Sequence, residues 1–217
     1  MTNFQIASCS LSYLLGSVPF GLIIGKLRGV DIRTQGSGNI GATNVFRCVG
    51  KPWGTAAFIL DFLKGYGATA LIPLLVETLT QEAFSVNLRL VCGILAILGH
   101  NYPIFLKFKG GKGIATSAGV LAGIAPLVIL PAIGAWLLLF LTTRYVSLGS
   151  IGAALMAAAG GWIFYPGQGA IPWALALLGL LAIWRHRSNI QRLLKGEENR
   201  FDFSKRRKKS PQEDPDE

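Results

Sequence analysis

The residues best suited to chemistry lie in three polar segments, and the first is a glycine-rich loop that ends in an arginine. It reads Gly36-Ser37-Gly38-Asn39-Ile40-Gly41-Ala42-Thr43-Asn44-Val45-Phe46-Arg47. Glycines permit tight turns in which backbone N–H groups approach an anion, and Arg47 adds a planar, permanently charged fork that fits phosphate. Further side-chain partners come from Ser37, Asn39, Thr43 and Asn44. The loop predicts either a phosphate site or a polar interfacial turn; it is not a Walker loop, because no Gly-Lys-Ser/Thr closes it.

The second segment is a glycine–lysine turn that precedes an apolar run. It reads Lys107-Phe108-Lys109-Gly110-Gly111-Lys112-Gly113. At the start of a helix such a turn offers backbone donors and an ammonium group to an anion. Ordinary basic charge beside a membrane would explain Lys107 and Lys109, but it explains the glycines around Lys112 less well.

The third segment follows the last apolar run and begins Trp184-Arg185-His186-Arg187-Ser188-Asn189. His186 and Asn189 are three residues apart, so on a helix they share a face. A histidine there titrates near neutrality and can act as acid, base or phosphate donor. The alternative is a basic cap beside the membrane with no chemical role.

Two further groups of polar residues carry weaker signals. Asp61 and Lys64 interrupt an apolar run at a spacing that lets them pair on one helix face, as a functional pair or as a structural one. Ser147, with Ser150, follows a short basic loop and could line the same site as the three segments.

Established patterns for covalent or metal catalysis are absent from the sequence. No GxSxG motif occurs, and neither His100 nor His186 is followed five residues later by the Asp of the HxxxxD acyltransferase signature. Two histidines and no carboxylate cluster argue against a metal, and the three scattered cysteines form no CxxC pair. We therefore expect no metal and no cofactor.

The elements that must position these segments are apolar runs of membrane length. The chain is 51% hydrophobic and only 15% charged, against roughly 25% charged in soluble domains. A membrane helix needs about 20 apolar residues, and the runs approach or reach this length. They cover residues 4–27, 55–76, 88–105, 114–142, 147–164 and 171–184. This pattern predicts an all-α integral membrane protein with one polytopic domain over residues 1–201, and a disordered charged cytoplasmic tail over residues 202–217.

The number of crossings depends on residues 114–142, which form either one long helix or a hairpin that turns at Pro126 or Pro131. The basic segments should all lie on the cytoplasmic side, whereas residues 77–88 contain two glutamates and no Lys or Arg. That arrangement puts the N-terminus outside and the C-terminus in the cytoplasm, which requires an odd number. Because the loop at Arg144 is also basic, we predict a hairpin and seven transmembrane helices, with five as the alternative.

Charge also bears on the class of partner. The net charge of +10 would suit nucleic acid, but the basic residues lie between apolar runs rather than on one soluble face, so no nucleic acid is expected. The lipid bilayer is the expected partner instead. A transporter for an organic phosphate would carry polar residues through the membrane midplane, whereas here they gather toward one side. A scaffold that recruits a soluble enzyme remains a third class.

Taken together, the segments resemble the acyl-phosphate-dependent glycerol-3-phosphate acyltransferase family of bacterial membranes. The blocks that carry the resemblance occur in order over most of the chain, at residues 16–21, 36–47, 60–65, 99–113, 144–147, 186–192 and 196–201. The resemblance implies seven helices with an external N-terminus. It also implies residence in the bacterial inner membrane, with the active site on its cytoplasmic face.

The same resemblance implies a reaction. A fatty acyl group passes from acyl phosphate to the 1-hydroxyl of sn-glycerol 3-phosphate, giving 1-acyl-glycerol 3-phosphate (lysophosphatidic acid) and inorganic phosphate, the first acylation of phospholipid synthesis. Neither acyl-CoA nor acyl carrier protein serves as donor, and a peripheral phosphate acyltransferase that makes the donor is a partner.

Combined with this resemblance, the three segments yield hypotheses for individual residues. Ser37, Asn44 and Arg47 hold phosphate and orient the attacking hydroxyl, while Lys112 neutralises the acyl phosphate and the leaving phosphate. His186 and Asn189 complete the glycerol-3-phosphate site. The base is a substrate phosphate oxygen or, alternatively, His186. The expected catalytic residues are Ser37, Arg47, Lys112 and His186, and the expected substrate-binding residues are Gly38, Asn39, Gly41, Thr43, Asn44, Gly110, Gly111, Gly113, Ser147 and Asn189.

Overall fold

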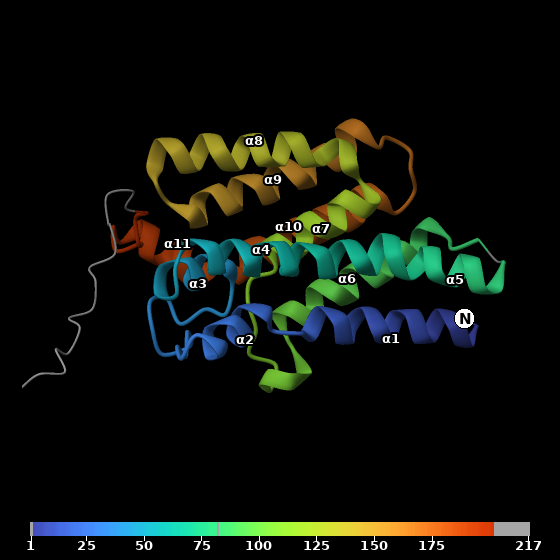
Figure 1. Ribbon diagram of the computed structural model, residues 1–217. Helices are drawn as coiled ribbons and strands as arrows, with labels where there is room; N and C mark the ends of the chain where they lie inside the picture. Colours follow the sequence, from blue (N-terminus) through green and yellow to red (C-terminus); the bar gives the residue numbers. More distant parts are fainter. Residues whose placement is uncertain (1, 82, 202–217) are drawn as a thin grey trace, which may run out of the picture.

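The computed structural model describes residues 2–81 and 83–201, and the described chain is helical (Figure 1). The predicted charged tail, residues 202–217, lies outside this part. The α-helices are α1 (Asn3–Ser17), α2 (Phe20–Leu27), α3 (Ala42–Cys48), α4 (Lys51–Tyr66), α5 (Ile72–Thr80), α6 (Val86–Asn101), α7 (Ile114–Ile124), α8 (Pro126–Thr143), α9 (Val146–Phe164), α10 (Ile171–Arg185) and α11 (Arg187–Leu194). A π-helical turn, η1 (Gly67–Leu71), joins α4 to α5, and a 3-10 turn, η2 (Ile104–Leu106), follows α6.

Five helical stretches of the described chain are long and apolar enough to cross a membrane. They cover Asn3–Leu27, Lys51–Thr80, Val86–Leu106, Pro126–Thr143 and Val146–Phe164. Two shorter apolar helices, α7 and α10, lie beside them. Large apolar side chains on these helices remain exposed, as expected for surfaces that contact lipid.

Prolines set two breaks in the apolar runs. Residues 114–142 do not form one helix, because α7 ends at Ile124 and α8 starts at Pro126, and the chain folds back between them (Figure 1). This confirms the predicted hairpin and shows that it turns at Pro126, where proline fits the first turn of a helix, and not at Pro131. Pro131 lies inside α8 and causes no break. The first run is also interrupted, at Val18 and Pro19 between α1 and α2.

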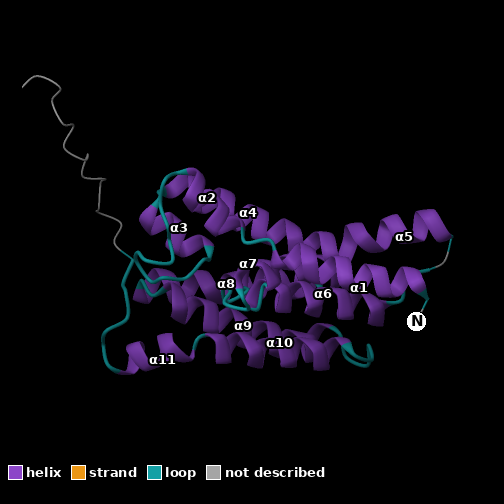
Figure 2. Ribbon diagram, turned by 90° about the horizontal axis from the view of Figure 1, so that it is seen from below, coloured by secondary structure: helices purple, strands orange, loops and turns teal. Residues whose placement is uncertain are grey.

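The helices run up and down, so the connecting segments gather at two ends. The N-terminus and the end of α5 lie at one end in both ribbon views, while α2, α3 and α11 lie at the other (Figures 1 and 2). The polar segments that the sequence singled out belong to α3, α11 and the loops of this second end. Segments far apart in the chain therefore meet there.

Small residues let the helices approach closely enough to fix this arrangement. A Cβ atom added to Gly119 would lie 1.9 Å from the carbonyl oxygen of Phe62, so α7 packs directly against the backbone of α4. A Cβ atom on Gly16 would lie 2.2 Å from the carbonyl oxygen of Ala96, which joins α1 to α6 in the same way. Close packing through glycine is typical of helices in lipid, where apolar burial gives little driving force.

Candidate active site

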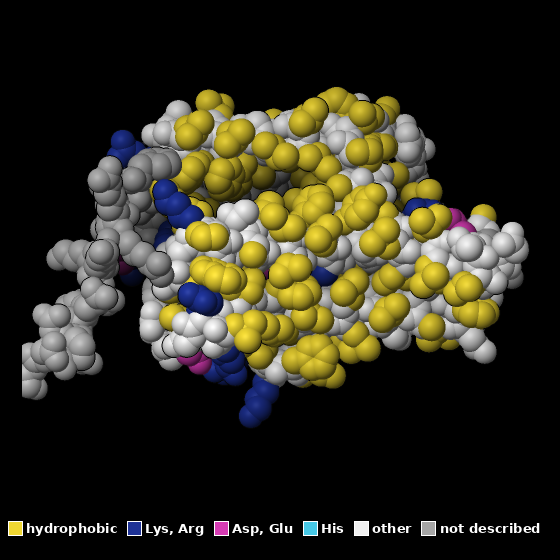
Figure 3. Space-filling view, viewed as in Figure 1, with side chains coloured by type: hydrophobic (Ala, Val, Ile, Leu, Met, Phe, Trp, Pro, Cys, Tyr) yellow, Lys and Arg dark blue, Asp and Glu magenta, His cyan; other side chains and the backbone are white. Residues whose placement is uncertain are grey.

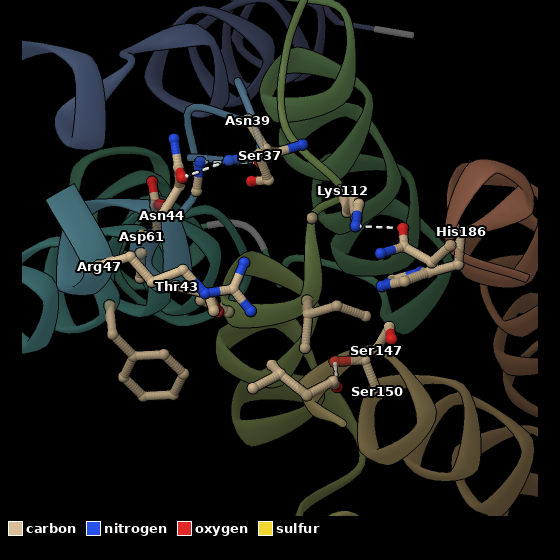
Figure 4. Close-up of a pocket in the computed structure, with 18 of the residues that line it drawn as sticks. Ser37, Asn39, Thr43, Asn44, Arg47, Asp61, Lys112, Ser147, Ser150 and His186 are labelled. Atoms are coloured by element: carbon tan, nitrogen blue, oxygen red, sulfur yellow. Dashed lines mark hydrogen bonds between the residues drawn. The ribbon is translucent and has the colours of Figure 1, made fainter. Parts of the chain in front are cut away.

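A polar cavity lies where α3, α9, α11 and the start of α7 meet, and Figure 4 shows part of its lining. Its volume of about 170 Å³ is more than ten times the roughly 10–15 Å³ that one water needs, so it admits a small molecule. Eleven of the predicted site residues line it: Ser37, Asn39, Gly41, Thr43, Asn44, Arg47, Lys112, Gly113, Ser147, His186 and Asn189.

Asn44 organises the first glycine-rich loop. Its buried side-chain amide donates to the carbonyl oxygens of Ile32 (2.7 Å) and Gln35 (3.1 Å), and its Oδ1 accepts from the backbone N–H of Ser37 (2.9 Å). These bonds fold the loop back onto α3. Asn44 lines the cavity, but its amide oxygen and nitrogen bond to the backbone of the loop. The structure therefore gives Asn44 a role in shaping the loop, whereas the sequence predicted a role in binding substrate.

Gly38 belongs to the loop but does not line the cavity. Its φ of +67° lies in the left-handed region that favours glycine, and a Cβ atom there would approach the carbonyl oxygen of Arg33. Gly38 thus shapes the turn between Ser37 and Asn39, and the direct contact with substrate that the sequence predicted has no support here.

Arg47 stands in the last turn of α3 and, like Ser37, is an exposed member of the site. Its guanidinium group reaches into the space between α3 and Lys112, which approaches from another side (Figure 4). Contact with surrounding protein atoms lowers the pKa of Arg47, but a guanidinium stays charged at any physiological pH. Two cationic side chains from distant segments therefore serve one cavity.

Lys112 is half-buried and donates from its Nζ to the side-chain oxygen of Asn189. Burial lowers the pKa of Lys112 to about 8; the charge of Glu198 acts in the opposite direction, while nearby Arg192 and Arg47 lower the pKa further. At neutral pH the ammonium form still predominates. A bound anion would relieve the repulsion among these cations, so the site is poised to accept one.

Gly110 and Gly111, which precede Lys112, were expected to bind substrate but do not line the cavity. The N–H of Gly110 donates to the carbonyl oxygen of Asn101 (3.2 Å), and the N–H of Gly111 donates to that of His100 (3.1 Å). Both N–H groups already pair with the end of α6, so the structure lends no support to the prediction that they bind phosphate, which stays a prediction. Backbone donors at the cavity come instead from the first turn of α7, which follows Gly113.

His186 lies buried at the junction of α10 and α11. Its Nδ1 is 2.8 Å from the carbonyl oxygen of Ala182, which fixes the tautomer with the proton on Nδ1. Burial, together with the charge of Lys112, lowers the pKa of His186 to about 4. The ring is thus neutral near pH 7, and its Nε2 can accept a proton or a hydrogen bond.

Glu198 lines the cavity and was not among the predicted site residues. Its carboxylate accepts from Ser147 Oγ (3.1 Å), Asn189 Nδ2 (2.8 Å) and Arg192 Nε (2.8 Å). The amide of Asn189 therefore joins Lys112 to Glu198, one through its oxygen and the other through its nitrogen. Glu198 fixes the orientation of Asn189 and Ser147; the sequence signal was the acidic pair Glu197-Glu198 within a basic segment.

Other residues that line the cavity were weak candidates in the sequence or were not predicted at all. Asp61 and His100 bring ionisable groups to the cavity from α4 and α6, and Ser150 adds a hydroxyl beside Ser147. Phe58 of α4 and Trp136 of α8 give the cavity an apolar wall. A cavity that combines charged and polar side chains with a larger apolar surface suits a ligand that has an anionic head and a hydrocarbon tail.

An apolar helical fold with a cation-bearing cavity at one end defines a class, that of helical membrane proteins whose site is suited to an anionic small molecule. The profile of the family described as Glycerol-3-phosphate acyltransferase matches residues 6–196. The chain belongs to this family.

Individual relatives agree in sequence and in structure. The glycerol-3-phosphate acyltransferase of Aquifex aeolicus is 46% identical over 88% of this chain and 95% of its own, and that of Geobacillus kaustophilus is 45% identical over 85% and 89%. The crystal structure of PlsY (YgiH), an integral membrane glycerol 3-phosphate acyltransferase in its glycerol 3-phosphate form, superposes with a TM-score of 0.81 at 43% identity, covering 91% of this chain and 96% of that one. Together with the apolar helices, this likeness identifies a multi-pass membrane protein.

Proposed function

We propose that this protein transfers a fatty acyl group from acyl phosphate to the 1-hydroxyl of sn-glycerol 3-phosphate. The products are 1-acyl-glycerol 3-phosphate (lysophosphatidic acid) and inorganic phosphate. Family membership supports the acceptor, and a solved relative in a lysophosphatidic acid form, 42% identical to this chain, supports the product. The choice of acyl phosphate as donor follows from the family resemblance, and the two cationic side chains in the cavity support it.

One observation carries the proposal: Arg47 and Lys112, from segments far apart in the chain, line the same cavity. Both substrates and both products carry phosphate, so two cations and the first turn of α7 match what the reaction must bind. Burial lowers the pKa of Lys112 to about 8, because the ammonium charge is poorly solvated there. A bound phosphate dianion would stabilise this charged form.

The reaction needs no covalent intermediate with the protein. The hydroxyl of glycerol 3-phosphate attacks the carbonyl carbon of the acyl phosphate, and the bond between that carbon and the bridging oxygen breaks. Acyl phosphate is a mixed anhydride with a good leaving group, so positioning and charge stabilisation supply most of the catalysis. Lys112 neutralises the departing phosphate, and Arg47 with Ser37 holds the acceptor.

The attacking hydroxyl loses its proton to a phosphate oxygen of the substrates, with His186 as the alternative acceptor. His186 is neutral near pH 7 and leaves Nε2 unprotonated, so it can also orient the hydroxyl. Replacing His186 with Gln keeps a hydrogen-bonding side chain but removes the base. Substrate-assisted transfer predicts residual turnover that rises with glycerol 3-phosphate concentration; near-complete loss without such recovery supports His186 as the base.

The acyl chain leaves the cavity along its apolar wall. Figure 3 shows a hollow between α8 and α4 bordered by hydrophobic side chains, and Phe58 and Trp136 line the cavity from these two helices. The head of the donor can enter the cavity while its hydrocarbon tail stays in the bilayer.

We further propose seven crossings, with the N-terminus outside and the cavity on the cytoplasmic face of the bacterial inner membrane. The five long spans and the two shorter apolar helices make seven if α7 and α10 also cross. The basic loops at the cavity end support this orientation. Single cysteines at Thr2 and Gly196 should react with a membrane-impermeant maleimide from opposite sides of oriented vesicles. In this arrangement a peripheral phosphate acyltransferase can deliver acyl phosphate directly from the cytoplasm.

The test is a comparison of three donors with the purified protein and labelled glycerol 3-phosphate: acyl phosphate, acyl-CoA and acyl carrier protein. Turnover with acyl phosphate alone is expected, with lysophosphatidic acid and phosphate formed in equal amounts. Uptake of glycerol 3-phosphate into protein-containing vesicles without a donor would favour a transporter. No turnover with any donor would favour a scaffold.

Arg47 provides a matched pair of variants with Arg33. Arg33 lies in the segment between α2 and α3, and its side chain is paired with Asp31 outside the cavity. Arg47→Ala should lower kcat/KM more than about tenfold, or about 1.4 kcal/mol of transition-state stabilisation, while Arg33→Ala should change it little. Equal effects would mean that general positive charge, rather than the cavity, attracts the substrates.

A further inference from the structure

Three ionisable side chains lie buried at the cavity or next to it, within helices of membrane length. Asp61 and Lys64 of α4 pair at 2.8 Å, and His100 Nδ1 of α6 lies 3.5 Å from Asp61 Oδ1. Their side chains are only 3%, 1% and 5% exposed. Charged groups at such depth are costly and are usually kept for a function. A carboxylate repels phosphate, so phosphate binding does not explain Asp61.

Within this group, Lys64 contacts the break between α1 and α2. Its Nζ donates to the carbonyl oxygen of Val18 at 2.9 Å. Val18 stands at the break between α1 and α2, where Pro19 has no N–H to continue the helix. Backbone groups exposed by such a break need a partner inside a membrane. Lys64 supplies one, so the ammonium group and the carboxylate of Asp61 beside it have set positions.

His100, at the other end of the group, packs against the turn that precedes Lys112. A Cβ atom on Gly111 would lie 2.1 Å from His100 Nε2, so the imidazole ring contacts the backbone of Gly111 directly. The carbonyl oxygen of His100 also accepts from the N–H of Gly111. Arg185 donates to the carbonyl oxygens of Gly110 (3.1 Å) and Gly111 (2.6 Å) from the other side. The turn before Lys112 is therefore held between an imidazole and a guanidinium.

We propose that Asp61 and His100 are positioning residues for Lys112. The carboxylate faces Nδ1 of the imidazole at 3.5 Å, the imidazole packs against the turn at Gly110 and Gly111, and the turn places the Lys112 ammonium in the cavity. The value of this device to catalysis rests on the proposed function, in which Lys112 neutralises the leaving phosphate. The competing role is direct: both side chains line the cavity, so either could take a proton from substrate.

Hydrogen exchange tests the structural half of the proposal without any substrate. In Asp61→Asn, the peptide that contains the Gly110 and Gly111 amides should exchange at least about tenfold faster than in the unaltered protein, while α9 keeps its protection. Asp31→Asn makes the same chemical change outside the cavity and should alter neither. Should Asp61→Asn fail to fold, His100→Gln carries the same expectation. Unchanged exchange at Gly110 and Gly111 overturns the proposal, as does faster exchange spread evenly over α9.

A double-mutant cycle tests the catalytic half. Asp61→Asn should lower kcat/KM with acyl phosphate at least about tenfold when Lys112 is present, and less than about twofold in the Lys112→Ala background. An equal loss in both backgrounds would mean that Asp61 acts apart from Lys112, as a proton acceptor would, and overturns the proposal. If the unaltered protein has no turnover with acyl phosphate, the proposed function fails, and the exchange result alone decides the positioning role.

Discussion

Raising the pH should remove the charge of Lys112 and, with it, most of the activity. Burial and neighbouring cations lower the pKa of Lys112 to about 8. Roughly nine-tenths of the molecules then carry the ammonium at pH 7 and roughly one-tenth at pH 9. If only the charged form neutralises the leaving phosphate, kcat/KM for acyl phosphate should fall about tenfold over this interval.

The assay is the initial rate at which labelled glycerol 3-phosphate becomes lysophosphatidic acid, corrected for hydrolysis of the donor without protein. The value of kcat/KM reports groups of the free enzyme, so it senses Lys112 before phosphate binds. His186, with its pKa lowered to about 4 by burial, does not titrate in this range, nor does a phosphate monoester with a second pKa near 6. A bound phosphate raises the pKa of Lys112, so the fall in kcat should begin at higher pH.

Lys112→Arg provides the control, because a guanidinium does not deprotonate below about pH 12. Its activity is expected to be lower at pH 7 owing to the changed shape, but to vary little up to pH 9. A flat profile for the unaltered protein would refute the assigned role of Lys112. So would an equal fall in Lys112→Arg, since the titrating group would then lie elsewhere.

Two stability predictions use thermal unfolding in detergent. Glu198→Ala leaves buried hydrogen-bond donors without a partner and should lower the free energy of unfolding by about 1–3 kcal/mol. Glu197→Ala, at the exposed neighbouring residue, should change it little. Equal shifts for the two variants would show that the carboxylate of Glu198 does not organise the site. Gly119→Ala forces a methyl group onto the carbonyl oxygen of Phe62 and should destabilise by about 1–3 kcal/mol, whereas Gly134→Ala meets nothing within 4 Å and should be neutral or slightly stabilising. Unchanged unfolding of Gly119→Ala would mean that α4 and α7 do not pack this closely.

The elements of the fold could be predicted because lipid imposes strict rules on composition and charge. The lengths of the apolar runs predicted the membrane spans, and the basic loop at Arg144 predicted a turn within residues 114–142. The sequence could not choose between Pro126 and Pro131, because either proline can begin a helix or bend one. In the structure the turn lies at Pro126, and Pro131 is inside α8.

The cationic residues of the site could be predicted because Arg47 and Lys112 lie beside glycines that ordinary basic loops do not need. The roles of Gly110 and Gly111 could not. Their N–H groups find partners at His100 and Asn101, and no pattern within residues 107–113 shows that the end of α6 lies beside them.

The missed residues depend on contacts across the fold. Helical spacing revealed the pair of Asp61 and Lys64, but His100 joins them from another helix. Glu198 is one of two adjacent acids in a basic segment, and only the approach of α9 and α11 shows that its carboxylate accepts several hydrogen bonds. Interactions between elements are set by tertiary packing, which local patterns do not encode.

The most direct measurement is an experimental structure of this protein with glycerol 3-phosphate and a non-transferable acyl phosphonate in place of the donor. We expect both phosphorus groups in the one cavity, with oxygens about 2.7–2.9 Å from the Arg47 guanidinium and from Lys112 Nζ, and the acyl chain between α4 and α8. Phosphate groups bound in two separate places, or away from Arg47 and Lys112, would contradict the account.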